Sequence, residues 1–599
     1  MAAGSAAAAV LLAAQRLPLD GFSYPLLFTR LFLGNPSLAK SAFLTMGAEA
    51  PYTRSAAWLG RLLAAVCRVT GASPEAAAGI VLLLCWAAAA ALMAILVARA
   101  TANRLAGAMA ALFLGAGVHL AMGDTPYCLV GLDRTMGLVP LLAAVCFWVA
   151  GRRAAGWATL AVATYVHANP AIYLWPLFGV DELLSARGGA WRGPAARLAA
   201  AAVAALPLLG SAGGNPWREF DPAFVAAAFK AARPWLGGFG YARTDWLYST
   251  TGWSLIALAW WRWRALPSAG LWARGFALAL FFVVAGRLAC LYPAPDSPLW
   301  GLLVKLQPWV SLYLVQLAGT VLVALMLAKA VTEAPEAGVP LAAAFLVSSR
   351  FDDYVLRLFI VAACAALAAG RRPWARTAML AAAALGFIGA LFGPALEALL
   401  RGVGLQGGSL TMPAFSLLSG VGLSLALAAG EAARRRGHAG TAALAVLLAA
   451  AGASSWAKEA RAPAPQDLAR LGRWVDANLE PDAVVTGSPL GVVDCQNFMN
   501  EARRALTPCP EVIGLAFAFG RGASVLVDDL EASGIDLGRL AAAPNAGAEG
   551  ARVDAELDAA RAQSLREKLG AGYLVTDKPR GWAGEPLRRE GALILYRLP

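Results

Sequence analysis

The sequence has few charged residues and almost no histidine. Of its 599 residues, 15% are charged and three are histidines, His119, His167 and His438. With so few histidines an all-histidine metal site is not expected, and no paired Cys/His spacing or HExxH motif is present. A Walker loop and a GxSxG motif are also absent. These absences argue against a zinc protease and an ATP-driven pump.

Hydrophobic residues fill most of the chain instead. They make up 59% of the sequence, and the mean hydropathy is +0.60. Apolar runs recur from the N-terminus to about Trp456, and many approach the roughly 17–25 residues that a spanning helix needs. The sequence therefore predicts an α-helical polytopic membrane protein with about 13–15 membrane helices. Some of them are short or broken, whereas positions 302–327 read as one long helix.

The net charge of +13 comes from short basic turns between apolar runs rather than from one patch. This pattern does not suggest a nucleic-acid partner. By the positive-inside rule, these turns are expected in the cytoplasm. They hold Arg99 and Arg104, Arg152 and Arg153, Arg187, Arg192 and Arg197, Arg262 and Arg264, Arg371, Arg372 and Arg376, and Arg434 to Arg436.

The chain divides into a membrane part, a linker and a tail. Residues 1–457 form the membrane part, in which loops 16–75 and 211–250 are too polar to span and are expected outside. Within the first loop, 26–32 and 56–69 have apolar and basic faces at helical spacing, typical of interfacial helices. The start, Met1 to Ala14, lacks a basic n-region and reads as a first helix. Residues 458–466 are a linker rich in Ala and Pro.

Residues 467–599 alternate helical and extended patterns and predict a small α/β domain. Strands are expected at 483–486, 572–576 and 592–598, and helices around Leu468 to Trp474 and at 557–569. An odd number of crossings places this domain outside the cytoplasm, in the periplasm or the extracellular space of a bacterium. Cys495 and Cys509 are spaced like a small disulfide loop, which suits that compartment.

One pair of membrane helices, 135–150 and 156–166, organises the polar residues. They fold around Arg152-Arg153, so their far ends should meet at the opposite membrane face. Asp124, Asp133 and Arg134 mark one of those ends, and His167 marks the other. Asn169-Pro170 then interrupts the following helix, and a break at membrane depth needs protein or water around it. We interpret this region as one wall of a site.

Polar residues of the membrane part gather on the outer face in this topology. A carboxylate there can take a proton from an acceptor hydroxyl, and Arg or His can hold a phosphate leaving group. Simpler interpretations stay open: Asp133-Arg134 as an interfacial helix start, His167 as a packing residue and Asp20 as the end of the first helix. Candidate contacts to donor phosphate or substrate are Arg134, His167, Asp133, Asp124, Asn169, Arg243 and Asp245.

The layout resembles the GT-C class of integral membrane glycosyltransferases. The resemblance rests on LPLDGF around Asp20, on GLDRTMG followed by YVHANP, and on RWVDANLEPDAVV and LGAGYLVTDKP in the tail. It implies a polyprenyl-phosphate sugar donor, Asp20 as the catalytic base and, in some members, a divalent metal. Many members carry two acids close together in the first loop, whereas here the next acid after Asp20 is Glu49.

We therefore expect an inner-membrane enzyme that transfers a sugar from a lipid-linked donor to a glycan, lipid or protein acceptor. No metal ligands are assigned. The alternatives are a lipid or polysaccharide transporter, whose broken helices would be gates, and a noncatalytic envelope-assembly protein. Few polar residues, among them Lys305, Gln307 and Gln316, lie within a span, which argues against a transport pathway.

Overall fold

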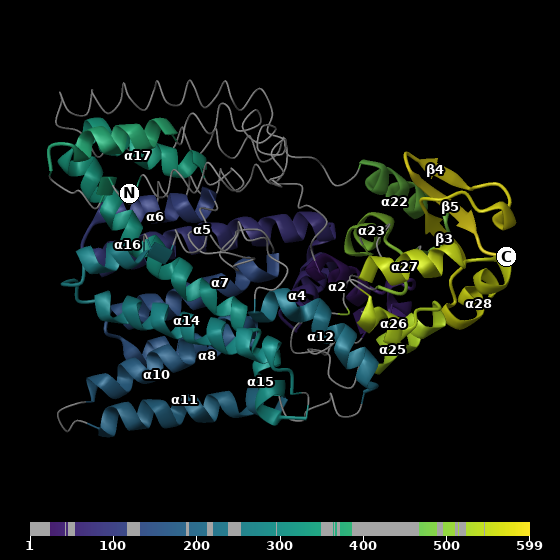
Figure 1. The fold of residues 1–599 in the computed structure, drawn as a ribbon, viewed down its shortest axis with the longest axis horizontal. Helices are drawn as coiled ribbons and strands as arrows, with labels where there is room; N and C mark the ends of the chain where they lie inside the picture. Colours follow the sequence, from purple (N-terminus) through teal and green to yellow (C-terminus); the bar gives the residue numbers. More distant parts are fainter. Residues whose placement is uncertain are drawn as a thin grey trace.

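The computed structural model describes residues 24–41, 44–45, 54–116, 132–186, 191–211, 220–237, 253–254, 256–294, 296–348, 363, 366–367, 372–385, 466–487, 495–509, 513, 523–543 and 546–599. The described chain has a body of packed helices and, at one end of that body, a smaller domain that carries the sheet (Figure 1). The predicted fold class, a helical membrane protein with a C-terminal α/β domain, is confirmed. The number of crossings and the side of the membrane on which the tail lies stay predictions.

The described part of the body consists of helices. They are α2 (Tyr24–Phe32), α4 (Arg54–Thr70), α5 (Pro74–Thr101), α6 (Arg104–Ala116), α7 (Leu132–Val149), α8 (Arg153–Val166), α9 (Ala168–Ala171), α10 (Leu174–Ser185), α11 (Arg192–Ser211), α12 (Pro222–Gly237), α14 (Ala269–Leu291), α15 (Pro298–Leu306), α16 (Leu312–Glu333) and α17 (Pro335–Ser348). Among the described residues, three helical stretches are long and apolar enough to cross a membrane: Pro74–Thr101, Ala269–Leu291 and Pro308–Glu333.

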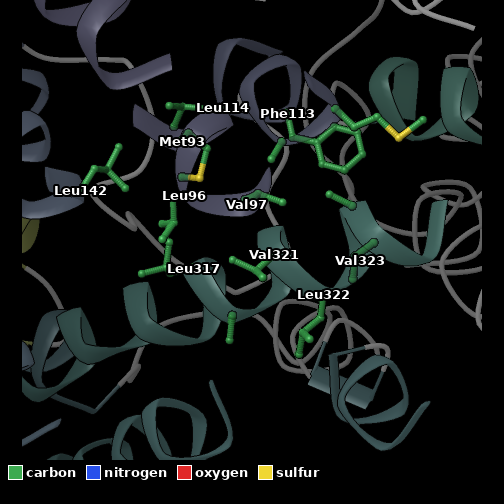
Figure 2. Packing of buried hydrophobic residues seen from close by; sticks show 14 of the residues in the cluster. Met93, Leu96, Val97, Phe113, Leu114, Leu142, Leu317, Val321, Leu322 and Val323 are labelled. Atoms are coloured by element: carbon green, nitrogen blue, oxygen red, sulfur yellow. The ribbon is translucent and has the colours of Figure 1, made fainter. Parts of the chain in front are cut away.

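Helix α16 is the centre of the body. Its most apolar 18-residue window is 94% buried, as expected of a helix that is hydrophobic on all sides. Figure 2 shows Leu317 and Val321 of α16 facing Leu96 and Val97 of α5, with side chains of α6 and α7 close by. This dry, close-packed contact holds the helices in place through van der Waals packing.

The two helices predicted in the first outer loop are present as α2 and α4, and their position at the membrane surface stays a prediction. They cross closely, because a Cβ added at Gly60 of α4 would lie only 2.5 Å from the Cβ of Phe28 in α2. Glycine is needed there since any side chain would push the two backbones apart. Helix α2 also contacts α5 and α7, so the first loop is fixed against the membrane helices.

The prediction of a single helix over 302–327 is wrong. Helix α15 ends at Leu306, Gln307 takes a left-handed conformation with φ 50°, and a 3-10 turn, η3 (Pro308–Ser311), leads into α16. Pro308 explains the interruption because it removes a backbone donor and disfavours helix at the preceding residue. The helix break predicted at Asn169-Pro170 lies instead at His167, which is extended (φ −150°, ψ 91°), and Asn169 and Pro170 belong to the next helical turn, α9. The described chain therefore contains two broken helices, one at His167 and one at Gln307.

The basic turns of several helices converge on two acids in α10. The Asp181 carboxylate pairs with Arg153 at 3.4 Å and with Arg274, and it accepts a hydrogen bond from the Trp148 indole at 2.9 Å. The adjacent Glu182, fully buried, pairs with Arg153 and Arg197. These contacts tie α8, α10, α11 and α14 together at the end of the body that holds the Arg152-Arg153 turn.

The C-terminal domain is a mixed sheet with helices around it. The sheet order is β2-β1-β3-β5-β4, parallel from β2 to β3 and antiparallel from β3 to β4. Its elements are α22 (Gln466–Asn478), β1 (Val484–Gly487), α23 (Cys495–Ala502), β2 (Ala505–Leu506), α25 (Ala523–Ala532), α26 (Leu537–Ala542), α27 (Ala546–Ala555), α28 (Ala559–Leu569), β3 (Tyr573–Thr576), β4 (Arg588–Glu590) and β5 (Leu593–Arg597). The three predicted strands are β1, β3 and β5, and the predicted helices are α22 and α28.

Cys495 and Cys509 form a disulfide whose Cα atoms are 5.8 Å apart. It joins the start of α23 to the segment after β2. Of the other described cysteines, Cys67, Cys146 and Cys290 are buried. Disulfides persist mainly outside the cytoplasm, so this one fits the predicted location of the tail.

The C-terminal domain rests on the two segments predicted to form outer loops. Leu27 and Phe28 of α2 share one apolar cluster with Phe498 and Met499 of α23. In the second loop, α12 packs against α26, and the Lys230 ammonium donates to the Ala541 carbonyl at 3.3 Å. Three segments far apart in sequence thus meet at one end of the body, and α10 is labelled toward the other end (Figure 1).

Candidate functional site

Helices α7 and α8 form the predicted hairpin, and its far ends touch. A Cβ added at Gly137, in the second turn of α7, would lie 2.4 Å from the Cβ of His167, the residue that ends α8. The backbone of α7 therefore passes directly beside the imidazole-bearing residue. The start of α7 and the end of α8 therefore lie side by side, as the hairpin predicts, and their place at one membrane face stays a prediction.

Arg134 and Asp133 lie in the first turn of α7. Arg134 precedes Gly137 by three residues, and residues three apart occupy neighbouring positions on one helix face. The backbone position of Arg134 is therefore one turn along the face that meets His167. Asn169 lies in α9, the single turn that follows His167. Arg134, His167 and Asn169 thus come from one compact stretch of backbone.

The two broken helices meet beside this stretch. Tyr173, buried between α9 and α10, places its hydroxyl within hydrogen-bonding distance of the carbonyl of Leu306 and of that of Gln307, the latter at 2.9 Å. Leu306 is the last residue of α15, and the Gln307 carbonyl also accepts a hydrogen bond from the Val310 amide of η3 at 2.8 Å. The Tyr173 ring packs against Phe282 and Tyr313, at centroid distances of 4.9 and 6.3 Å. Tyr173 therefore connects the break after α8 with the break after α15.

Sequence reasoning did not find Tyr173 or the break at Gln307. The available signal was the Gln307-Pro308 pair, which has the same form as Asn169-Pro170. Sequence reasoning also did not single out Asp181 and Glu182. The sequence signal for them was two adjacent acids near the end of an apolar helix, on the side of the membrane where the neighbouring turns carry arginine.

Four of the predicted site residues lie outside the described residues. They are Asp20, Asp124, Arg243 and Asp245. Asp20 precedes the first residue of α2 by four positions, and Asp124 precedes the start of α7 by eight. Among the residues that the structure describes, no group of three or more His, Cys, Asp or Glu has the proximity that a metal ion needs.

The C-terminal domain contacts this end of the body through polar groups as well as apolar ones. Arg30 of α2, 9% exposed, donates to the Asn500 carbonyl at 2.7 Å and pairs with Glu75 at 2.5 Å. Ser37 donates to the Ala483 carbonyl and accepts from the Ala505 amide at 2.8 Å. Ala483 adjoins β1 and Ala505 begins β2, so the first loop is bonded to the sheet edge.

An exposed ion pair completes this contact. The Lys40 ammonium lies 3.0 Å from the Asp482 carboxylate, in the loop between α22 and β1. The hydrogen bond from Lys40 lowers the pKa of Asp482 below its ordinary value, so the carboxylate is charged at neutral pH. In the same loop, the hydrogen bond from the Tyr573 hydroxyl at 2.6 Å lowers the pKa of Glu480.

Comparison with known proteins finds matches among solved structures only. No protein-family model and no curated protein sequence matches the chain. The crystal structure of ArnT from Cupriavidus metallidurans in the apo state aligns with 15% identity and a TM-score of 0.47, covering 99% of this chain and 97% of that chain. The same protein bound to undecaprenyl phosphate aligns with 14% identity and a TM-score of 0.45, covering 100% and 97%.

ArnT is a membrane glycosyltransferase of the GT-C class, which is the class that the sequence resembles. Because the identities are near 15% and the TM-scores are below 0.5, function has to be argued from the residues of this chain.

Proposed function

We propose that the chain is a membrane glycosyltransferase that moves a sugar from a polyprenyl-phosphate carrier to an acceptor hydroxyl. The observation that carries this proposal is the contact between Gly137 and His167, since it brings the first turn of α7 to the end of α8. A cation and an imidazole on neighbouring backbone, beside two broken helices, suit the phosphate group of a lipid carrier.

The acid of the first loop is tied to the same region through α2. Asp20 precedes Tyr24 by four residues, and four residues of extended chain reach at most about 14 Å. Helix α2 contacts α7, and α7 carries Asp133 and Arg134. The short chain separation from α2 and the contact of α2 with α7 support the proposed role for Asp20 beside the phosphate-binding residues.

The proposed reaction divides the work between a base and phosphate-binding residues. Asp20 takes the proton of the acceptor hydroxyl while its oxygen forms a bond to the anomeric carbon of the sugar. The bond from that carbon to the phosphate oxygen breaks, and the carrier phosphate leaves with the electron pair. Arg134 and His167 hold the phosphate and stabilise its developing charge. Asp133, Asp124, Asn169, Arg243 and Asp245 are proposed further contacts to the substrates.

A divalent metal, which the class resemblance implies for some members, enters no step of this proposal. Among the described residues no suitable group of metal ligands is found, and Asp20 has no second acid nearby in sequence. We propose that the C-terminal domain, bonded to the first loop through Arg30 and Ser37, positions the acceptor at the bacterial inner membrane on its periplasmic side.

The test is transfer of labelled sugar by the purified full chain. Undecaprenyl phosphate, the ligand named for one of the similar structures, is the natural first carrier to load with sugar. We expect Asp20→Asn to abolish transfer, and Arg134→Gln and His167→Gln to lower kcat/KM by about 10²–10³-fold. Glu336→Gln, whose site lies in α17 at the other end of α16, serves as the matched control. Full activity in both Asp20→Asn and Asp133→Asn contradicts the assigned chemistry.

A lipid transporter is the second candidate, and one observation favours it. Buried polar residues follow one another from the break into α16: Gln307, Ser311, Gln316 and Thr320. However, the Ser311 hydroxyl donates to the Ala279 carbonyl at 3.1 Å and the Thr320 hydroxyl to the Gln316 carbonyl at 2.9 Å, as packing residues do. Movement of fluorescent lipid across reconstituted vesicles, without any sugar transfer, identifies the transporter. Binding of lipid phosphate with neither activity identifies an assembly protein.

A further inference from the structure

A cavity lies at the end of the body away from the candidate site. It encloses about 430 Å³ and is formed by residues 262–263, the last turns of α16, and the helix Ala375–Leu385 with the residues just before it. Lys329 follows Leu312, the first residue of α16, by 17 positions, and at about 1.5 Å per residue this is about 26 Å along the axis. The cavity is therefore separate from the site near Gln307.

The cavity has a cationic rim. Arg262, Lys329, Arg372 and Arg376 line it, together with one acid, Glu333. Arg376 is paired with Glu336 at 3.2 Å, and the Arg262 guanidinium lies over the Trp263 ring at 5.4 Å from its centroid. Within the described part of the chain, Arg262, Lys329 and Arg372 have no carboxylate partner. The rim therefore carries excess positive charge that a bound anion can neutralise.

The floor of the same cavity is apolar. Met326 and Met379 are each 5% exposed, Leu367 is 8% exposed, and Ala330 and Ala366 complete the lining around them. A cavity that is cationic at its mouth and apolar at its floor matches a ligand with one charged end and one hydrocarbon end. A small soluble anion would leave this apolar surface uncovered.

Exposed tryptophans next to the rim indicate the level of the membrane surface. Trp261, 58% exposed, adjoins Arg262, and Trp374, 49% exposed, lies between Arg372 and Arg376 in sequence. Exposed tryptophans collect where hydrocarbon meets the lipid headgroups. The rim is therefore placed at the depth at which lipid phosphates lie.

We propose that this cavity binds the phosphate of an anionic phospholipid, with its glycerol and first methylenes on the apolar floor. Lys329 and Arg372 contact the phosphate oxygens, and Met326 and Met379 contact the hydrocarbon. This site does not depend on the glycosyltransferase proposal, because it lies at the other end of α16 and uses different residues.

The experiment is titration of the purified full chain, in neutral detergent, with phosphatidylglycerol, followed by native mass spectrometry. Phosphatidylcholine, which has no net charge, is the lipid control, and inorganic phosphate is added as a competitor. We expect the double variant Lys329→Gln with Arg372→Gln to weaken phosphatidylglycerol binding by about 25-fold. Each cation near the membrane surface contributes about fivefold to the affinity. Phosphatidylcholine binding should not change.

Two further variants make the result specific. Arg192→Gln with Arg264→Gln removes two exposed arginines from basic turns on the same predicted side, neither of which lines the cavity, and should leave affinity unchanged. Glu333→Gln removes the acid of the rim and should tighten binding about fivefold. Equal losses in both double variants, no gain with Glu333→Gln, or full displacement of the lipid by millimolar inorganic phosphate overturns the proposal.

Discussion

Two single residues show how little freedom the helix packing leaves. At Gly137 the neighbouring His167 fills the space that a side chain would need, since a Cβ there would lie 2.4 Å from its Cβ. At Glu182 a fully buried carboxylate depends on two arginines for its charge compensation. The first residue sets a backbone separation and the second fixes the relative positions of three helices.

Gly137→Ala should move α7 away from α8. We expect a loss of about 1–3 kcal/mol of stability from overpacking, and a drop in sugar transfer of about 10²-fold because the phosphate contacts shift. Thermal unfolding in detergent and transfer assays measure the two effects. Gly79→Ala in α5 is the control, because nothing lies within 4 Å of its added Cβ, and it should be neutral or slightly stabilising. Similar behaviour of both variants contradicts the close contact.

Glu182→Gln should destabilise the body more than any exposed charge change. The substitution keeps the shape of the side chain but leaves Arg153 and Arg197 with one buried negative partner fewer, and breaking a buried pair costs about 3–5 kcal/mol. Glu336→Gln breaks a pair whose arginine is 65% exposed, so it should cost no more than about 1 kcal/mol. Thermal unfolding of the two variants side by side tests this difference, and equal shifts contradict it.

Among the elements, those with a strong local pattern were predictable from sequence. Interfacial helices α2 and α4, the α7–α8 hairpin, and strands β1, β3 and β5 each carry an apolar period or a turn signal that a short window reveals. The break at Gln307 was missed because the apolar residues on both sides of Pro308 continue one hydrophobic run. Strand β4, Arg588–Glu590, was missed because an all-charged edge strand has no apolar alternation.

The candidate site was predictable only in part, because its parts come together through tertiary contacts. The sequence indicated that Arg134 begins the first helix of a hairpin and His167 ends the second. The turn between the helices was enough to predict that these two ends lie side by side. Nothing local indicates that Tyr173 reaches Gln307, 134 residues away. In the same way, nothing near Asp181 in sequence indicates its ion pair with Arg274, 93 residues away.

At the scale of the whole molecule, the joint between the C-terminal domain and the first loop is the contact most open to test. Ser37→Ala removes a buried hydroxyl that serves both Ala483 and Ala505, and should weaken the joint by about 1–3 kcal/mol. Hydrogen exchange of the Ala505 amide should accelerate accordingly. Lys40→Ala, which removes an exposed partner, should change exchange little at pH 7, and faster exchange in that variant than in Ser37→Ala contradicts the assignment.

The same joint should depend on pH in one direction only. The pKa of Asp482 is lowered by Lys40, so its contribution is complete above the ordinary value for aspartate, about 3.9, and is lost as the pH falls through the lowered value. The protection that this pair gives the Ala505 amide should therefore be constant between pH 5 and 8 and should fall slightly below about pH 4. In Lys40→Ala this loss of protection at low pH should be absent. If the loss persists in Lys40→Ala, it comes from other carboxylates.

The side of the membrane on which this joint lies is the last prediction. Arginine-rich turns meet Asp181 and Glu182 at one end of the body, while α2, α12 and the C-terminal domain meet at the other. If the arginine turns are cytoplasmic, the domain is outside, where the Cys495–Cys509 disulfide is stable. Alkaline phosphatase fused after Pro599 should then be active, and green fluorescent protein fused there should be dark. The reverse pattern places the domain in the cytosol and contradicts the proposal that it positions the acceptor on the periplasmic side.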